Sequence, residues 1–342
     1  MEMGKVSILM TAYNCINYID QAVKSVLSQS YLDFELCIVD DCSTDGTREY
    51  LSALKHNKIK VYYNEYNMGY LNSFNFILNM ASGEFITFLD GDDYLANNKI
   101  EKQVNFMISH NYEVSGTQYY KIDEKDNQIS SVSNLPINRE QMQRAIQCGD
   151  MPCVGSSIMI TRKVLDNIGG YRDYFSGIPG EDIDWISRIL DKFDGANINE
   201  ALYYYRFHSN SLTRKVHTTV KARHVREIIA FLSEERKLML GKDSLSLDTS
   251  PTPLDSFIDE IEQNYIKDKF LMERKVIFDC AVNGQFNLAF NKLKQVIFSD
   301  DWRSFNKNLK VFFYIVILYL FPSSLLLKVM GILNVKNITS RM

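Results

Sequence analysis

Three aspartates that follow an apolar run, in the segment FITFLDGDDYL, are the most unusual chemical group in this chain. Asp90, Asp92 and Asp93 stand close together, although the Asp-Gly turn that ends such a run needs only one of them. Like charges at this spacing repel, so the group costs free energy unless a cation balances it. Clustered carboxylates suit Mg²⁺ or Mn²⁺, which commonly complete their coordination with phosphate oxygens. The segment therefore predicts a metal that holds a phosphorylated substrate.

The sequence contains no glycine-rich loop of the kind that binds phosphate through the backbone. Neither GxGxxG nor GxxxxGK[ST] occurs. A nucleotide would then have to be held through the metal, so a metal-bridged nucleoside diphosphate is the expected ligand.

A second acidic segment, DDCSTDGT, contains more carboxylates than a turn requires. An Asp-Gly turn that caps the next helix explains Asp45 and Gly46, but not Asp40 and Asp41. A calcium loop is the alternative, but its twelfth position would be Ser52 instead of Glu, and the segment follows a strand instead of a helix. We therefore expect Asp40 and Asp41 to contact a ligand.

A third acidic segment, GEDIDW, begins an expected helix. The helix dipole favours acids in a first turn, which explains one acid well and three poorly. Asp182 and Asp184 are two residues apart, so they diverge by about 200° on a helix and only one of them can face a site.

Strands and helices alternate over the first third of the chain. Strands are expected at 5–13, 34–41, 58–64 and 84–90, and helices at 17–30, 44–55 and 70–81. This alternation with short connections predicts an α/β fold with a mostly parallel sheet flanked by helices. Ligands bind beyond the carboxyl ends of such strands. Three strands end in Thr11 and Tyr13, in Asp40 and Asp41, and in Asp90 and Asp92.

The rest of the chain predicts a change of architecture near residue 215. Further strands are expected at 114–122, 156–161 and 201–208, with a helix at 181–193. After residue 215 come a helix at 220–240, a Ser/Pro-rich linker at 241–256 and helical patterns to the end. We therefore expect an α/β domain at 1–215 and an α-helical C-terminal region at 216–342.

Composition and charge narrow the function further. The net charge of −4 gives no electrostatic reason to expect nucleic acid as a partner. Six cysteines without zinc spacing predict reduced thiols in a cytoplasmic protein, and the N-terminus MEMGKVSILM predicts no signal peptide.

The segment 302–342 has six basic residues and no acidic one, which suggests an anionic surface as partner. Its apolar stretch 311–327 contains Pro322 and spans about 25 Å as a helix, short of the ~30 Å bilayer core. It could cross a membrane, lie in the membrane interface or pack on the protein. We expect peripheral contact with the inner face of the cell membrane.

Four ordered motifs carry a resemblance to a known family. VSILMTAYN, SVLSQSYLDFELCIVDDCSTDGT, NMGYLNSFNFILNMASGEFITFLDGDDYL and GEDIDW together resemble an inverting family 2 glycosyltransferase with the GT-A fold, over residues 4–215. The resemblance implies a nucleotide site in which Tyr13 stacks on uracil and Asp92, in the DxD motif, binds the metal that bridges the diphosphate. The other residues that it places at the nucleotide are Thr11, Asp40, Asp41, Asn75 and Asp90, the last at the ribose.

The same resemblance implies the residues that act on the sugars. Asp182 matches the general base of the ED motif, with Asp184 as a rival, and Glu181 would contact sugar hydroxyls. His208 in YRFHSNS resembles a residue that meets the metal or the diphosphate. Gly155 and Ser156, in CVGSSIMITR, resemble the loop beneath the donor sugar.

Two departures from the family pattern bear on the recognition of the nucleotide base and on the number of sugars transferred. Phe74 stands where the family often has an Arg before Asn75, so one contact to the base is missing. The QxxRW motif of processive synthases does not occur, which favours transfer of a single sugar.

The resemblance thus implies transfer from a nucleotide sugar, a UDP-sugar in most of the family, to a glycan or lipid-linked glycan in O-antigen or capsule assembly. The alternatives are a nucleotidyltransferase, which the GEDIDW motif disfavours, and a non-catalytic subunit that binds nucleotide sugars.

Overall fold

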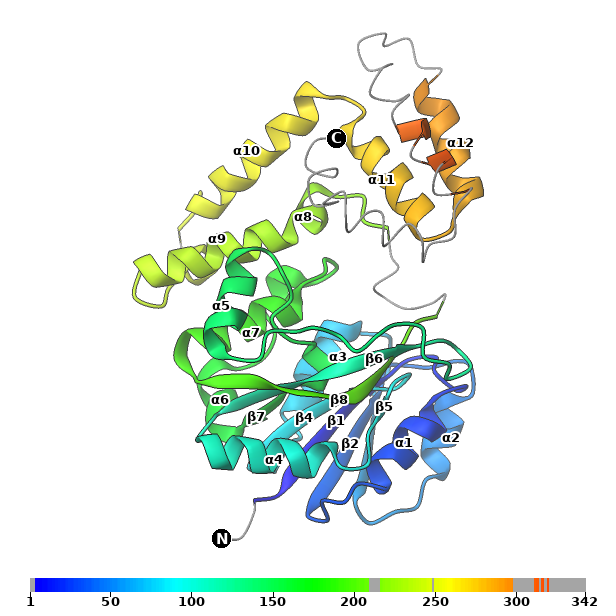
Figure 1. Cartoon of the computed structure of the whole chain (residues 1–342), viewed down its shortest axis with the longest axis vertical. Coiled ribbons are helices and arrows are strands. Elements are labelled where there is room, and N and C mark those ends of the chain that lie inside the picture. The colour runs from blue at the N-terminus through cyan, green and yellow to red at the C-terminus, as the bar shows by residue number, and fades with distance from the viewer. Residues whose placement is uncertain are drawn as a thin grey trace. The chain divides into compact units, whose positions relative to one another are not determined.

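A computed structural model describes residues 4–208, 216–247, 249–297, 311–313, 315–316 and 319 (Figure 1). The chain forms two compact units. The first comprises Met1–Ser209 and Val225–Leu247, and the second comprises Asn210–His224 and Asp248–Met342.

The first unit contains an eight-stranded sheet with the order β3-β2-β1-β4-β7-β6-β8-β5. Four neighbouring pairs are parallel (β3-β2, β2-β1, β1-β4 and β6-β8), and the other three are antiparallel. The strands are β1 (Val6–Ala12), β2 (Phe34–Asp40), β3 (Ile59–Tyr63), β4 (Phe85–Asp90), β5 (Tyr94–Leu95), β6 (Val114–Ile122), β7 (Met159–Thr161) and β8 (Gly195–Arg206).

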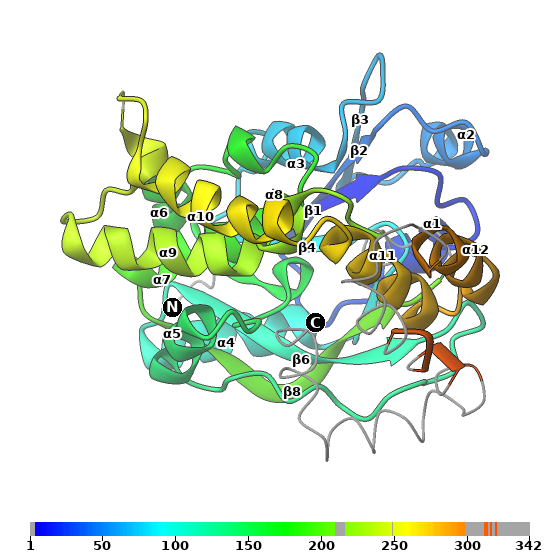
Figure 2. The same cartoon turned by 90° about the horizontal axis from the view of Figure 1, so that it is seen from above.

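Helices cover both faces of this sheet (Figure 1). The helices of the first unit are α1 (Ile19–Leu27), α2 (Thr47–Ala53), α3 (Tyr70–Leu78), α4 (Lys99–His110), α5 (Arg139–Gln147), α6 (Arg162–Ile168), α7 (Glu181–Lys192) and α9 (Val225–Leu238). Those of the second are α8 (Val220–Arg223), α10 (Pro253–Lys267), α11 (Leu271–Val282) and α12 (Phe286–Ile297) (Figure 2).

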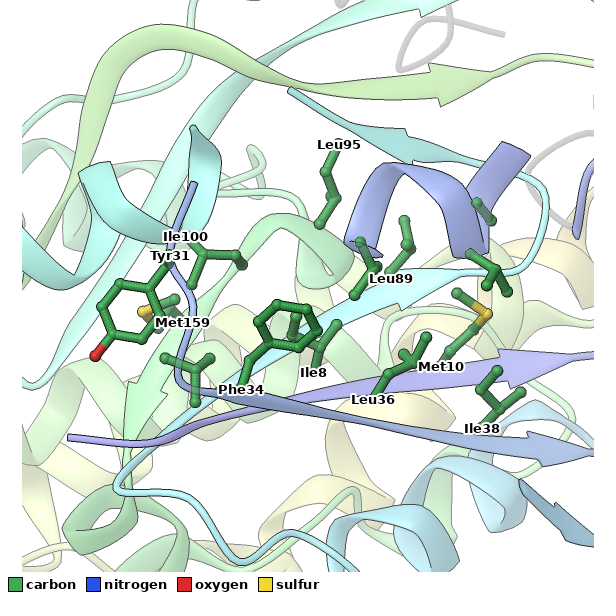
Figure 3. Close-up of a cluster of buried hydrophobic side chains, with 14 of the residues drawn as sticks. Ile8, Met10, Tyr31, Phe34, Leu36, Ile38, Leu89, Leu95, Ile100 and Met159 are labelled. Atoms are coloured by element: carbon green, nitrogen blue, oxygen red, sulfur yellow. The ribbon is translucent and has the colours of Figure 1, made fainter. Parts of the chain in front are cut away.

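The central strands are apolar on both faces, as expected for parallel strands covered by helices. On one face, β1 and β2 meet α1 and α4 in a cluster that includes Ile8, Leu36 and Ile100 (Figure 3). On the other face, Phe88 of β4 stacks on Phe74 of α3 at 4.8 Å between ring centroids. Burial of each such side chain contributes about 1.5–3 kcal/mol, so the two layers hold the carboxyl ends of the strands rigidly.

Some boundaries differ from the sequence expectations, each for a local reason. β8 begins at Gly195 instead of 201, because Asn197 is buried with its amide donating to Pro136 and Pro152 carbonyls. A 3₁₀ turn at Gly155–Ser157 precedes a short β7. The helix expected at 220–240 is interrupted at His224, between α8 and α9.

The C-terminal part of the first unit includes residues that the sequence places in a linker. The linker expected at 241–256 contains a 3₁₀ turn at Ser244–Ser246 and the start of α10 at Pro253. Asp243 is fully buried and pairs with Arg172 and Arg236. The division by contacts therefore differs from a single boundary at residue 215, since α9 belongs with the sheet.

The second unit has its own apolar core, formed mainly by α11 and α12. Ile277, Leu293, Val311 and Ile315 are buried in it. Among the described residues, no helix is long and apolar enough to span a membrane. Most of the basic segment 302–342 lies outside the described residues, and so does the membrane contact expected there.

Candidate active site

The ends of three strands bring the predicted polar residues to one edge of the sheet. In the strand register, Thr11 of β1 pairs with Asp90 of β4, and Ala12 pairs with Asp40 of β2. Tyr13, one residue beyond β1, is 53% exposed and its ring is available to a ligand. Residues that the sequence spreads over eighty positions are therefore neighbours here.

Gly91 lets the end of β4 approach the end of β1 closely. A Cβ atom at this position would lie 2.8 Å from Cys15 Sγ and 3.2 Å from the carbonyl oxygen of Thr11. Only glycine fits without a shift of the backbone. The Asp90-Gly91-Asp92 sequence thus reflects a packing requirement as well as chemistry.

The three acids of this segment have different surroundings. Asp93 is buried, with Oδ2 accepting from the Tyr203 hydroxyl at 2.7 Å and Oδ1 accepting from the Arg206 backbone N–H at 2.7 Å. Burial and the neighbouring carboxylates raise the pKa of Asp93 well above its usual value. Asp93 therefore fastens the end of β4 to β8.

Asp90 lies against the 3₁₀ turn that carries Ser156. Burial, followed by the charge of Asp92, raises the pKa of Asp90 to about 7, while hydrogen bonds from the Ser156 and Tyr70 hydroxyls oppose this rise. Tyr70 was not expected from the sequence, because nothing in its spacing marks it. It is the first residue of α3, and burial, followed by the charge of Asp90, raises the pKa of Tyr70 well above its usual value.

Asp92, two residues beyond the end of β4, contacts His208, two residues beyond the end of β8. Asp92 Oδ2 and His208 Nε2 are 2.8 Å apart, and the two side chains are 30% and 11% exposed. The two side chains share a hydrogen bond here, and a carboxylate oxygen beside an imidazole nitrogen is a ligand pair that suits Mn²⁺ better than Mg²⁺, which prefers oxygen alone. Within the described residues, no group of three or more His, Cys, Asp or Glu side chains is placed to hold a metal. An ion here would need further ligands from the substrate or water.

Asp182 and Gly155 are in contact, although 27 positions separate them. A Cβ atom at Gly155 would lie 2.8 Å from Asp182 Cβ and 3.0 Å from its Oδ2. Asp182 Oδ1 accepts from the Ile183 backbone N–H at 2.8 Å. Burial raises the pKa of Asp182, and backbone N–H groups and the charge of Arg226 oppose the rise. An effective general base has a pKa near the pH at which the enzyme works, and the raised pKa of Asp182 is closer to that value.

We expect Gly155→Ala to reduce turnover about a hundredfold while nucleotide binding persists, because a displacement of the order of 1 Å in a reacting group can cost that much. The added methyl meets the Cβ of Asp182, which cannot rotate away. Steady-state kinetics would measure kcat. Ser157→Ala, in the same 3₁₀ turn, adds no atom and serves as control. An unchanged kcat in Gly155→Ala would contradict this role for Gly155.

The buried, acidic surroundings of Glu181 lead us to expect that the stability of the protein depends on pH. Burial, followed by the charge of Asp182, raises its pKa from 4.5 to about 8. Between these values the folded protein keeps a proton that the unfolded chain loses, so the free energy of unfolding falls as pH rises. Glu181→Gln should therefore raise the melting temperature by a few degrees at pH 8 and leave it unchanged at pH 4.

Thermal melts at both pH values would measure the effect of Glu181→Gln, with the exposed Glu49→Gln in α2 as control. Equal shifts at pH 4 and pH 8 would show that the carboxylate is not the cause.

Asp184 and Asn75 both have hydrogen-bond partners within the protein. Asp184 is fully buried and accepts from Arg172 Nε at 2.9 Å and Arg188 Nε at 3.0 Å, and its role as a rival base or sugar contact remains a prediction. The Asn75 side chain donates to the Tyr171 carbonyl at 2.9 Å and accepts from its N–H at 2.8 Å. Each of its polar side-chain atoms thus has a backbone partner, and a contact of Asn75 to the nucleotide remains a prediction.

Asp40 and Asp41 organise the loops around them. Asp40 accepts from the Ser43 N–H at 3.3 Å and lies 3.8 Å from Arg48 Nε. Asp41 accepts from the backbone N–H groups of Met68 at 2.8 Å and Gly69 at 2.9 Å. These bonds shape the entry to α3, and a direct contact of either acid to a base remains a prediction.

Arg226 is a further residue that the sequence did not single out. It lies in α9, far along the chain from α7, and its positive charge opposes the rise that burial causes in the pKa of Asp182. Its guanidinium donates to the Gly149 carbonyl at 3.2 Å. One arginine among many in a helix carries no sequence signal, so only the packing of α9 identifies it.

Comparisons with known proteins agree on one family for this chain. The profile of Glycosyl transferase family 2 matches residues 7–169, which include the strand ends but not Asp182 or His208. The Escherichia coli UDP-Glc:alpha-D-GlcNAc-diphosphoundecaprenol beta-1,3-glucosyltransferase WfaP is 32% identical over 70% of this chain and 92% of its own length.

Solved structures share the fold at low sequence identity. S. aureus TarS 1–349, solved with UDP-GlcNAc, has a TM-score of 0.57 at 18% identity and covers 82% of this chain and 80% of its own. The mannosyltransferase PcManGT from Pyrobaculum calidifontis, solved with GDP-Man and Mn²⁺, has a TM-score of 0.50 at 14% identity. The match covers 99% of this chain and 84% of the PcManGT chain.

Proposed function

Because the chain belongs to glycosyltransferase family 2, we propose that it transfers one sugar from a UDP-sugar to a hydroxyl of a glycan acceptor, with inversion at the anomeric carbon. The GT-A fold predicted from the sequence, with its helical C-terminal region, is confirmed by the family and the solved structures. Membership in the family also confirms the general activity of a glycosyltransferase, of the type used for bacterial polysaccharides.

One observation supports this reaction above all others. Ser156 hydrogen-bonds Asp90, which ends a strand at the expected nucleotide side, and its neighbour Gly155 contacts Asp182. Two consecutive residues therefore separate the expected nucleotide carboxylates from the expected base. A donor sugar lying over this turn would present its anomeric carbon between the two groups.

Asp182 would act as the general base. Its carboxylate takes the proton of the acceptor hydroxyl, whose oxygen forms a bond to the anomeric carbon as the bond to the diphosphate oxygen breaks. The diphosphate leaves with the electron pair on the opposite face, so the configuration inverts. A neutral sugar hydroxyl is a poor nucleophile, which is why a positioned base with a raised pKa is needed.

Asp92 and His208 would hold the divalent cation, Mn²⁺ or Mg²⁺. When bound, the ion supplies positive charge that stabilises the leaving diphosphate. The two side chains are neighbours that share a hydrogen bond, so both could reach one ion, and the solved structure of the mannosyltransferase PcManGT contains Mn²⁺. The Asp92 side chain is 30% exposed, so an ion bound to the substrate could reach it.

The choice of UDP rests on exposed aromatic surface and on relatives. Tyr13 offers a half-exposed ring at the end of β1 for stacking on uracil. WfaP is named for UDP-Glc, and TarS was solved with UDP-GlcNAc. The diphosphoundecaprenol in the name of WfaP also supports a lipid-linked acceptor here. We place the enzyme in the cytoplasm, on the inner face of the cell membrane, with 302–342 as a basic contact to it.

A panel of nucleotide sugars incubated with the enzyme and Mn²⁺ tests the function. The expected result is UDP release from one donor. NMR should show a new linkage to the acceptor whose anomeric configuration, α or β, is opposite to that of the sugar in the donor. Release of pyrophosphate would instead indicate a nucleotidyltransferase. Binding without release from any donor, with acceptor present, would indicate a non-catalytic subunit.

A further inference from the structure

The turn that follows α9 exposes two leucines to solvent. We call residues 237–242, with the sequence KLMLGK, the α9 tip. Leu238 is 77% exposed and Leu240 is 99% exposed, more than any other large apolar residue among those described. In Figures 1 and 2 the C-terminal end of α9 reaches beyond the edge of the sheet. Burial in the fold thus does not explain these side chains.

The α9 tip has a defined shape that is held from both ends. Leu240 has φ of 52° in the left-handed region, which is unfavourable for leucine, and the Gly241 N–H donates to the Arg236 carbonyl at 2.7 Å. Arg236 and Asp243, on either side of the tip, are both buried and paired at 2.8 Å. An exposed leucine held in a strained conformation suggests a role outside folding.

Positive charge surrounds the leucines. Lys237 and Lys242 flank them and are exposed, and Lys237 pairs with only one acid, Glu234, at 3.0 Å. Beside the tip lies a cavity of about 310 Å³ that Lys237 and Gly241 help to line. Its other charged lining residues are Arg172, Arg188, Lys192 and Arg236 against Asp191 and Asp243. The three arginines pair with Asp184, Asp191 or Asp243 and their side chains are at most 19% exposed, so the positive charge open to solvent here is that of the exposed lysines Lys192, Lys237 and Lys242.

We propose that the α9 tip is a contact site for an anionic phospholipid surface. The leucines enter the boundary between headgroups and acyl chains, and the exposed lysines face the lipid phosphates. Two leucines are too small an area for a stable protein interface, which needs about 800 Å² per partner, so the surface fits lipid better than a second protein. This contact lies in the first unit and is distinct from the basic segment 302–342.

Flotation of the full-length protein with vesicles tests the proposal. Vesicles of phosphatidylglycerol and phosphatidylcholine are compared with vesicles of phosphatidylcholine alone. The double variant Leu238→Ser with Leu240→Ser should bind the anionic vesicles about tenfold more weakly. The control is Leu32→Ser, an equally accessible leucine at 75% exposure, which should bind as the wild type does.

A second pair of variants tests the contribution of the lysines to phosphate recognition separately from the insertion of the leucines. Lys237→Ser with Lys242→Ser should weaken binding about tenfold at low salt, and much less at high salt. Lys55→Ser with Lys125→Ser removes the same charge at exposed positions elsewhere and should have little effect. Unchanged binding in both tip variants, or an equal loss in the controls, would overturn the proposal.

The outcome is independent of the proposed reaction. The tip variants should keep wild-type turnover on a soluble acceptor, and Asp182→Asn should still bind vesicles. A variant with the six basic residues of 302–342 replaced by serine is a further comparison: loss of binding only in that variant would place the contact in 302–342 and exclude the α9 tip.

Discussion

The Asp182→Asn enzyme is expected to bind UDP and Mn²⁺ as the wild type does, yet to lose sugar transfer by between about a hundredfold and ten-thousandfold. The amide keeps the shape of the side chain and its contact with Gly155, and it can still accept from the Ile183 N–H. It cannot take a proton from the acceptor. Calorimetry with UDP and product formation from the donor would measure the two effects separately.

Asp184→Asn is the matched control for this prediction, because it makes the same chemical change two residues away. It removes the charge that Arg172 and Arg188 balance, so it should lower the melting temperature substantially. Turnover per folded molecule should fall far less than in Asp182→Asn. Retained turnover in Asp182→Asn would move the base elsewhere, with Glu181 as the remaining acid of the motif.

The sequence predicts the elements of the first unit well because their signals are local. β6 lies at 114–122 as expected, and α7 begins at Glu181. The alternation of apolar strands and amphipathic helices implies parallel pairing, and parallel pairing alone brings Thr11, Asp40 and Asp90 to one edge. That part of the site follows from topology.

The roles of individual acids depend on partners that are distant in the chain, and no local pattern reveals them. Asp93 is fixed by Tyr203, 110 positions later, and Asp184 is fixed by Arg172. Asn75 resembles a nucleotide contact by motif, but its amide holds Tyr171, 96 positions later. A motif identifies which residues lie near the site, but the packing of the whole unit decides which hydrogen-bond partner each of them has.

The Asp92→Asn enzyme is expected to lose the metal-dependent part of donor binding. In the wild type, Mn²⁺ should tighten UDP binding, because Asp92 and His208 supply protein ligands to the ion. The amide is a weaker, uncharged ligand, so UDP affinity in Mn²⁺ should fall by about a hundredfold. Calorimetric titration of UDP with Mn²⁺, and again with EDTA, would measure the difference.

The control for Asp92→Asn is its neighbour, Asp93→Asn. Asp93 accepts from Tyr203 and Arg206 in the interior, so its replacement should change stability while Mn²⁺ still tightens UDP binding. The two variants make the same chemical change at adjacent positions, so a general disturbance of this segment would affect UDP binding alike in both. A selective loss in Asp92→Asn would therefore locate the metal at the side chain that faces His208. Equal behaviour of the two variants, or an Mn²⁺ effect that survives in Asp92→Asn, would contradict that location.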